Sequence, residues 1–268
     1  DLSEWKCLLD TFHTLPSDDR SGLMDDVFSI ARSSADEGIL SDNYHVPMSF
    51  ANQLKTEQDL TVWSSGLSHL MWMGNILSLV PKERSTSLCA TSFKAFFLQV
   101  VGPRVTQLGI VPDPKDNHLT RLLRIRLVGA AASHGHQATI DAAKAIYADP
   151  KQRNSLSPDE QSIVYRAVVR WGDAAVFNEV LAMYHAATFA PEKKRYMYAL
   201  ASSRDPALIQ RVLNMAINPK EVRGQDTVSL LAAVASYTEG SHPAWAFVKE
   251  HWSTLYETYG SGGFALTR

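Results

Sequence analysis

The chain contains 268 residues, of which 45% are hydrophobic and 20% are charged, and its formal net charge is −2 at pH 7. This composition is typical of a folded protein with a sizeable core. It shows neither the basic excess of a nucleic-acid-binding protein nor an apolar run of the roughly 18–20 residues that span a bilayer. We therefore expect no nucleic-acid partner and no membrane partner.

Apolar residues recur with helical spacing along the chain, and strand signals are scarce. Near the N-terminus, residues 21–34 place Leu23, Val27 and Ile30 on one predicted helix face, with Met24, Phe28 and Ala31 beside them. Two further long helices are predicted within residues 59–80 and 85–101. The tryptophans at helical or turn positions are predicted to anchor the core, and they include Trp63, Trp72, Trp171, Trp245 and Trp252.

Residues 119–130 form a later predicted helix in which arginines interrupt the apolar pattern. Its predicted apolar face consists of Leu119, Leu122, Leu123, Leu127 and Ala130. Arg126 falls inside that stripe, whereas Arg124 lies toward another face. An arginine among apolar side chains requires a carboxylate or carbonyl partner, or else lines a cavity. We favour an inter-helix salt bridge over a ligand contact.

Two segments of the second half, 172–184 and 204–216, match each other through shared Asp, Ala, Val, Leu and Met positions. Asp173 and Asp205 are the predicted N-caps, and Pro206 suits the first helical position. A third copy of this segment, residues 241–252, has Pro243 at the position of Pro206 in the second copy. Repeated helix pairs predict an all-α superhelix of HEAT/armadillo-like antiparallel helix pairs, with residues 1–268 as one solenoid domain.

Polar residues crowd into the stretch before the apolar segment 228–235. Asn218 is a predicted helix cap, and a second helix is predicted to begin near Gln225 or Asp226, with Asp226 as a candidate cap. Because this helix is apolar on all sides, we expect it to be covered on both faces. Arg223 lies where the helix dipole disfavours a cation, so we expect it to have an anionic partner.

Patterns that carry chemistry are absent from the sequence. His134 and His136 flank a glycine, and we interpret them as part of a polar loop rather than as a metal site. The motifs His-Glu-x-x-His, Cys-x-x-Cys and Gly-x-Ser-x-Gly do not occur. We therefore assign no catalytic, cofactor-binding or metal-binding residue. The candidate cavity-lining or structural residues are Arg124, Arg223, Gln225 and Asp226.

Cysteine usage and the chain ends bear on location and completeness. Cys7 and Cys89 are too few for a disulfide framework, two thiols are favoured over one bridge, and no Asn-x-Ser/Thr sequon occurs. We therefore expect a reducing, cytoplasmic setting. Because the chain opens on Asp1 and stops in an apolar segment after "GG", we expect a piece of a longer protein, truncated at both ends.

The last third of the chain resembles the C-terminal helical domain of the zinc aminopeptidases that include aminopeptidase N and puromycin-sensitive aminopeptidase. The upstream segments 19–33 and 122–136 also resemble that domain, through Arg20, Leu23, Asp26 and Phe28 and through Leu122, Leu123 and Arg124. The residues that carry the resemblance in the last third are Val222, Arg223, Gln225, Asp226, Ala244, Trp245, Phe247, His251, Trp252, Tyr259 and Gly260.

The resemblance implies a HEAT-like bowl that closes the substrate chamber of a zinc-dependent catalytic domain in the same polypeptide. Peptides are then the substrates, the zinc belongs to the absent domain, and this fragment alone has no cofactor and no activity. In some relatives, basic and aromatic residues of the inner wall hold the peptide C-terminus. The corresponding positions of this chain, Gly74, Asn75, Ser202 and Ser236, carry no charge. The alternative is a free-standing HEAT-like protein-interaction scaffold.

Overall fold

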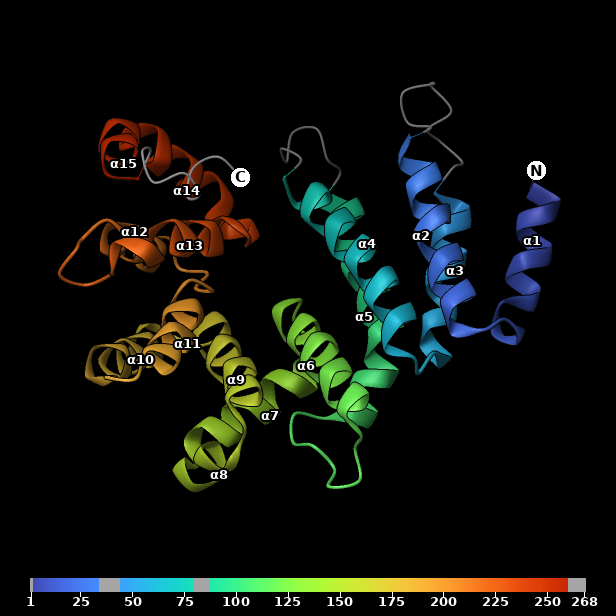
Figure 1. Cartoon of the computed structure of the whole chain (residues 1–268), viewed down its shortest axis with the longest axis horizontal. Helices are drawn as coiled ribbons and strands as arrows, with labels where there is room; N and C mark the ends of the chain where they lie inside the picture. The colour runs from blue at the N-terminus through green and yellow to red at the C-terminus, as the bar shows by residue number, and fades with distance from the viewer. Residues whose placement is uncertain (1, 34–43, 80–86, 260–268) are drawn as a thin grey trace. The chain divides into compact units, whose positions relative to one another are not determined.

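The computed structural model of the chain describes residues 2–33, 44–79 and 87–259. Within these ranges the regular structure consists of fifteen α-helices and two short 3₁₀ helices, without a strand (Figure 1), which confirms the all-α prediction. No helix of this part of the chain combines the length and the apolarity needed to cross a bilayer. The predicted apolar segment at the C-terminal end lies outside the described residues.

The chain divides into two compact units, residues 1–139 and residues 140–268. The helices that begin in the first unit are α1 (Leu2–Thr11), η1 (Phe12–Thr14), α2 (Ser17–Ser33), α3 (His45–Gln53), η3 (Leu54–Thr56), α4 (Leu60–Leu79), α5 (Ser87–Leu108), α6 (His118–Ser133) and α7 (Gln137–Ala148). In this unit α2 packs on α4 and α4 packs on α6, while α5 lies against α4 and α6.

The second unit has the same kind of organisation. Its helices are α8 (Pro150–Ser155), α9 (Pro158–Trp171), α10 (Ala174–Ala186), α11 (Ala190–Leu200), α12 (Pro206–Ala216), α13 (Gly224–Ala235), α14 (Thr238–Glu250) and α15 (Trp252–Tyr259). Each helix from α9 to α11 contacts the other two, α11 contacts α13, and α12 contacts α13 and α14. Alternate helices thus contact each other within the unit, as stacked helix pairs require.

The buried face of α2 differs from the predicted one. Met24, Val27, Phe28 and Ala31 are buried, while Ile30 is 50% exposed. These four residues follow the i, i+3, i+4, i+7 spacing of a helix stripe as well as the predicted set does. Packing against α4 buries Val27 together with the three residues predicted beside the main face, and it leaves Ile30 on the surface.

Trp63 confirms its predicted role, and a buried carboxylate fixes its position. The indole is fully buried, and its Nε1 donates to the backbone oxygen of Glu57 at 2.9 Å. The Glu57 carboxylate accepts hydrogen bonds from Arg20 Nε and Nη2, at 2.8 and 3.1 Å. It also accepts the backbone N–H groups of Gln58 and Asp59. One glutamate therefore joins α2, η3 and α4.

Three other predicted core tryptophans lie on the surface. The exposed fractions are 38% for Trp72, 62% for Trp245 and 48% for Trp252. The prediction was wrong because a large aromatic residue in a helical pattern does not reveal whether a neighbouring helix covers it.

The predicted caps of the repeat are confirmed. Asp173 Oδ1 accepts the N–H groups of Ala175 and Val176, Asp205 Oδ1 accepts those of Ala207 and Leu208, and Pro206 is the first residue of α12. Pro243 does not begin a helix, because α14 has already begun at Thr238 and contains it. The third copy therefore does not share the helix start of the other two.

The segment before α13 is a turn rather than a capped helix. Asn218 Oδ1 accepts the N–H of Lys220, and Asn218 O accepts those of Glu221 and Val222, after which the chain extends. The helix α13 is also not covered on both faces. Leu230, Leu231 and Val234 are buried, whereas its small residues Ala232 and Ala235 are exposed. Alanine counts as apolar in the sequence pattern, but its small side chain costs little to expose. The pattern therefore predicted burial for a face that is exposed.

Glu239 at the start of α14 unites distant parts of the second unit. It accepts Arg170 Nη2 at 3.0 Å and Arg204 Nε at 2.8 Å. The guanidinium of Arg170 also lies 4.9 Å from the ring centroid of Tyr237, and that of Arg204 lies 4.4 Å from the ring of Trp171. Cation–π contacts and one carboxylate thus connect α9, the α11–α12 turn and α14.

Replacing Glu57 tests the carboxylate that joins α2, η3 and α4. Glu57→Ala leaves the largely buried Arg20 without its carboxylate, so we expect a loss of about 3 kcal/mol in the free energy of unfolding. Urea denaturation measures it. The control Asp26→Ala, on an exposed part of α2, should change stability by no more than about 0.5 kcal/mol. Equal losses in the two variants would contradict the role given to Glu57.

The pH dependence of stability tests Glu239. Burial opposes its ionisation, but Arg170 and Arg204 outweigh this effect and hold the pKa of Glu239 below its ordinary value of 4.5. As the pH falls, the unfolded chain therefore binds the proton first. The stability from Glu239 is present above about pH 4.5 and is lost as the pH falls through the lower pKa of the folded state.

We accordingly expect the wild type to lose thermal stability more steeply than Glu239→Gln below that pH, and to be the more stable of the two at pH 7. The control Glu250→Gln, at the exposed end of α14, should keep the wild-type slope. Parallel melting profiles for the wild type and Glu239→Gln between pH 3 and pH 7 would refute this assignment.

Candidate functional site

Arg223 lies at the N-terminus of α13 and is paired with a carboxylate of the same helix. Its Nε and Nη2 donate to Asp226 Oδ2 at 2.9 and 2.7 Å, and Lys194 Nζ of α11 lies 3.0 Å from Oδ1. The Asp226 side chain is 7% exposed, whereas those of Arg223 and Lys194 are 52% and 42% exposed. Asp226 therefore supplies the anion that a cation needs at a helix N-terminus.

The surroundings of Asp226 keep it ionised. Burial opposes ionisation, but hydrogen bonds from Lys194 and Arg223 and the charges of both cations outweigh it, so the pKa of Asp226 lies below its ordinary value. A carboxylate held by two cations is a poor general base. The contacts instead tie α11 to the start of α13, which is a structural role.

Asp226 does not cap α13, contrary to the sequence-based expectation. The N-cap is Arg223, without a side-chain cap, and Asp226 is the third helical residue. Gln225 is exposed at the second helical position. The helix begins at Gly224, two residues before Asp226, so Asp226 lies inside its first turn and not at its cap.

In the first unit, the structure reverses the assignment of the two arginines of α6. Arg124 is 2% exposed, and Arg126 is exposed, together with Leu119 and Leu122. Arg124 Nε donates to Leu108 O at 3.1 Å, and its Nη2 donates to Asp116 Oδ2. The partners are thus a carbonyl at the end of α5 and a carboxylate of the α5–α6 loop. The reasoning about a buried arginine applies, but to Arg124 rather than Arg126.

A hollow of about 680 Å³ opens beside Arg124. Its walls come from the end of α5, the start of α6 and the loop between them, and they include Arg104, Asp113 and Asp116. Reasoning from the sequence missed Arg104 and Asp116. A usable signal was present, because the loop "DPKDN" places two carboxylates within reach of an arginine one to two turns into the next helix.

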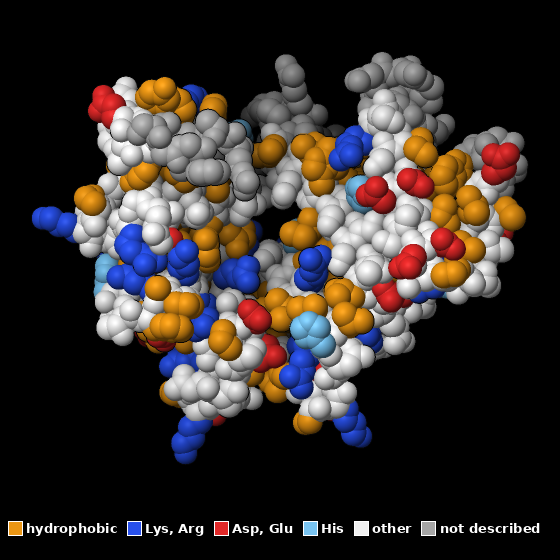
Figure 2. Space-filling view, in the orientation of Figure 1, with side chains coloured by type: hydrophobic (Ala, Val, Ile, Leu, Met, Phe, Trp, Pro, Cys, Tyr) orange, Lys and Arg blue, Asp and Glu red, His pale blue; other side chains and the backbone are white. Residues whose placement is uncertain are grey.

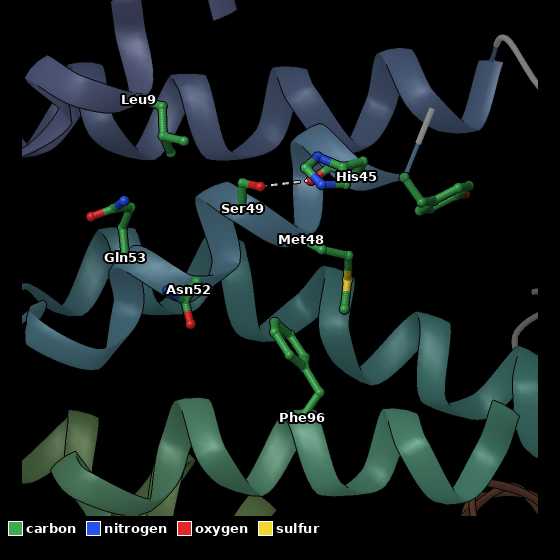
Figure 3. A pocket seen from close by; sticks show the side chains of 8 residues that line it. Leu9, His45, Met48, Ser49, Asn52, Gln53 and Phe96 are labelled. Carbon is green, nitrogen blue, oxygen red and sulfur yellow. Dashed lines mark hydrogen bonds between the residues drawn. The ribbon is translucent and has the colours of Figure 1, made fainter. Parts of the chain in front are cut away.

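A second hollow, of about 600 Å³, lies between α1, α3 and α5 (Figure 3). Leu9, Met48 and Phe96 supply apolar walls, and Asn52 and Gln53 supply amides. Ser49 Oγ, the hydroxyl of this wall, donates to the backbone oxygen of His45. His45 also lines the hollow, but the Ser49 hydroxyl donates to its backbone oxygen, and no hydrogen bond joins this hydroxyl to the imidazole among the described residues.

The histidine pair lies in a turn, as predicted. The ring of His134 packs on Phe97 with its Nδ1 2.8 Å from Ala130 O, and His136 Nδ1 lies 2.8 Å from Thr139 Oγ1. Throughout the described residues, no three side chains of His, Cys, Asp or Glu gather as a metal would require. The two histidines therefore act within the turn, where they bind a backbone oxygen and a hydroxyl.

The positions that the resemblance assigns to an inner wall have different environments. Ser202 is fully buried, and its Oγ donates to Ala199 O and Arg166 O, so it cannot contact a ligand without rearrangement. Asn75 and Ser236 are exposed. Asn75 lies among exposed apolar residues of α4, namely Met71, Trp72, Ile76 and Leu79. In Figure 2, hydrophobic side chains gather over the end of this helix.

Comparison with known proteins gives a consistent picture. Aminopeptidase M1 of Arabidopsis thaliana is 31% identical over 263 residues, which cover 95% of this chain and 28% of the relative. The human thyrotropin-releasing hormone-degrading ectoenzyme is 28% identical, covering 98% and 25%. The mouse glutamyl aminopeptidase is 26% identical, covering 90% and 24%. The chain thus spans about a quarter of the length of these relatives.

The family model that describes the ERAP1-like C-terminal domain matches residues 1–268. This match covers both compact units and every described helix. It also agrees with the resemblance seen in the segment around Arg223 and Asp226. The chain therefore belongs to the ERAP1-like C-terminal domain family.

Proposed function

We propose that the chain is the non-catalytic C-terminal domain of a zinc-dependent aminopeptidase, where it closes the substrate chamber and contributes to peptide access and binding. The proposal rests on two shares, namely how much of the chain the domain family covers and how much of each relative the chain covers. The domain family accounts for all 268 residues, while the chain accounts for 24–28% of the relatives named as aminopeptidases. In this proposal the remaining length holds the zinc and the catalytic residues.

The arrangement of the helices supports a role as a wall. Within each unit, alternate helices contact one another, as they do in stacked helix pairs. We propose that residues 1–268 form a single domain, a HEAT/armadillo-like superhelix. Two cysteines and the lack of a sequon support a cytoplasmic location, which subcellular fractionation can test.

The exposed face of α4 is our candidate for peptide contact. Met71, Trp72, Asn75, Ile76 and Leu79 lie about one and two helical turns apart and share one side of the helix. Large apolar residues grouped on a surface favour contact with another molecule or domain. Uncharged residues on this face would bind peptide side chains rather than a terminal carboxylate.

The absence of chemistry in this chain is testable directly. We expect the isolated 268-residue chain to leave an aminoacyl-coumarin reporter intact with zinc added, and the full-length polypeptide to cleave it until zinc is chelated. Fluorescence release measures both. Turnover by the isolated chain would refute the non-catalytic role. A full-length polypeptide without a catalytic domain would favour the free-standing scaffold.

A substitution on α4 tests the peptide-contacting face. In the full-length polypeptide, Ile76→Ser should raise KM for peptides of about eight to twelve residues about fivefold, because one apolar contact of about 1 kcal/mol is lost. Values of kcat/KM for the short reporter should stay unchanged. The control Ile30→Ser replaces an isoleucine of similar exposure on α2, and an equal rise in its KM would contradict a specific role for α4.

A further inference from the structure

The hollow between α5 and α6 contains a buried arginine that is only partly satisfied. Arg124 has 2% of its side chain exposed and uses Nε for Leu108 O and Nη2 for Asp116. Its Nη1 is also buried, but it makes no hydrogen bond with a described residue. A buried guanidinium N–H without an acceptor is unfavourable, since it has lost its hydration and gained nothing in exchange.

A second arginine on the same wall is in a similar state. Arg104 Nη1 donates to Gln107 Oε1 at 3.0 Å, while its buried Nε has no acceptor among the described residues. Burial lowers the pKa of Arg104, the charge of Asp116 opposes that effect, and the charge of Arg124 adds to it. Two cations that repel each other thus share one wall of the hollow.

One oxygen of each carboxylate in the hollow accepts hydrogen bonds from neighbouring residues. Asp116 Oδ2 accepts both Arg124 and the N–H of Asp113, and Asp113 Oδ1 accepts the N–H of Lys115. Arg104, Lys115 and Arg124 outnumber these two acids among the lining residues. The lining of the hollow therefore carries a positive excess, and two N–H donors without an acceptor lie buried in its wall.

We propose that this hollow is a binding site for an oxyanion, whose oxygens accept hydrogen bonds from Arg104 Nε and Arg124 Nη1. Phosphate and carboxylate groups share the required chemistry, because both present several negatively charged acceptors to guanidinium groups. A volume of about 680 Å³ leaves room for a group larger than a single ion. The site lies within the first unit and does not depend on the proposed role in an aminopeptidase.

The two arginines have separable roles. Arg124 binds the end of α5 and the α5–α6 loop, so its loss would also disturb the fold. Arg104 donates to the exposed Gln107, which lies on the same helix, and it is repelled by Arg124. Arg104→Gln should therefore remove anion binding and leave the anion-free chain at least as stable as the wild type.

Calorimetric titration of the 268-residue chain tests the proposal, with potassium phosphate, sulfate and acetate as separate probes at constant ionic strength in chloride. We expect saturable phosphate binding and a melting temperature that rises with phosphate concentration. Arg104→Gln should raise the Kd about tenfold or more. The control Arg126→Gln removes a charge from an exposed position of α6 outside the hollow and should bind as the wild type does.

The probes distinguish the sources of the oxyanion, since tighter acetate binding indicates a carboxylate ligand and tighter phosphate or sulfate binding indicates a tetrahedral one. The NMR signal of Arg124 Nε–H supplies a readout that needs no variant, and it should shift as phosphate saturates. Lack of saturable binding by all three probes would overturn the proposal. Equal Kd values for the wild type and Arg104→Gln would overturn it as well.

Discussion

In each unit, the helices that pack together have one apolar side each, and the fold depends on a neighbouring helix packing against that side. An isolated helix of this kind is marginal in water, so its stability comes from the neighbour that covers its stripe. In the first unit, α2 is covered by α4, and α4 in turn contacts α6. In the second, α9, α11 and α13 contact one another in succession. Every one of these helices thereby serves as cover for the next.

Arginine–carboxylate pairs set the junctions between these helices. Arg20 with Glu57, Arg124 with Asp116, and Arg170 with Glu239 each connect a helix to a loop or to the start of another helix. The planar guanidinium offers several donors in fixed directions, so one residue can satisfy both a carboxylate and a carbonyl. Arg124 also joins a carboxylate and a carbonyl, but its Nη1 has no acceptor among the described residues. This unused donor makes Arg124 part of a candidate binding site as well as of a structural junction.

Under the proposed function, the chain would contribute surfaces rather than reaction chemistry to the enzyme. Asp226 is held by two cations, and the hydroxyl of Ser49 is bonded to its own helix. Among the described residues, α4 presents an exposed apolar face, and a hollow with a positive excess lies beside α6. Both are suited to contact with a ligand or another domain, which is consistent with a domain that encloses an active site located elsewhere.

The sequence by itself determined the all-α class, the family and part of the local helix signals, while the caps expected at Asn218 and Asp226 did not form. Asp173, Asp205 and Pro206 act within one helical turn, so their roles follow from the order of residues alone. Tertiary structure decided which face of each helix is buried. Arg124 and Arg126 differ by two positions, and apolar residues flank both, so the sequence pattern fits more than one stripe. Only the end of α5 and Asp116, brought together by the α5–α6 loop, select Arg124, because a buried guanidinium needs acceptors that sequence spacing does not locate.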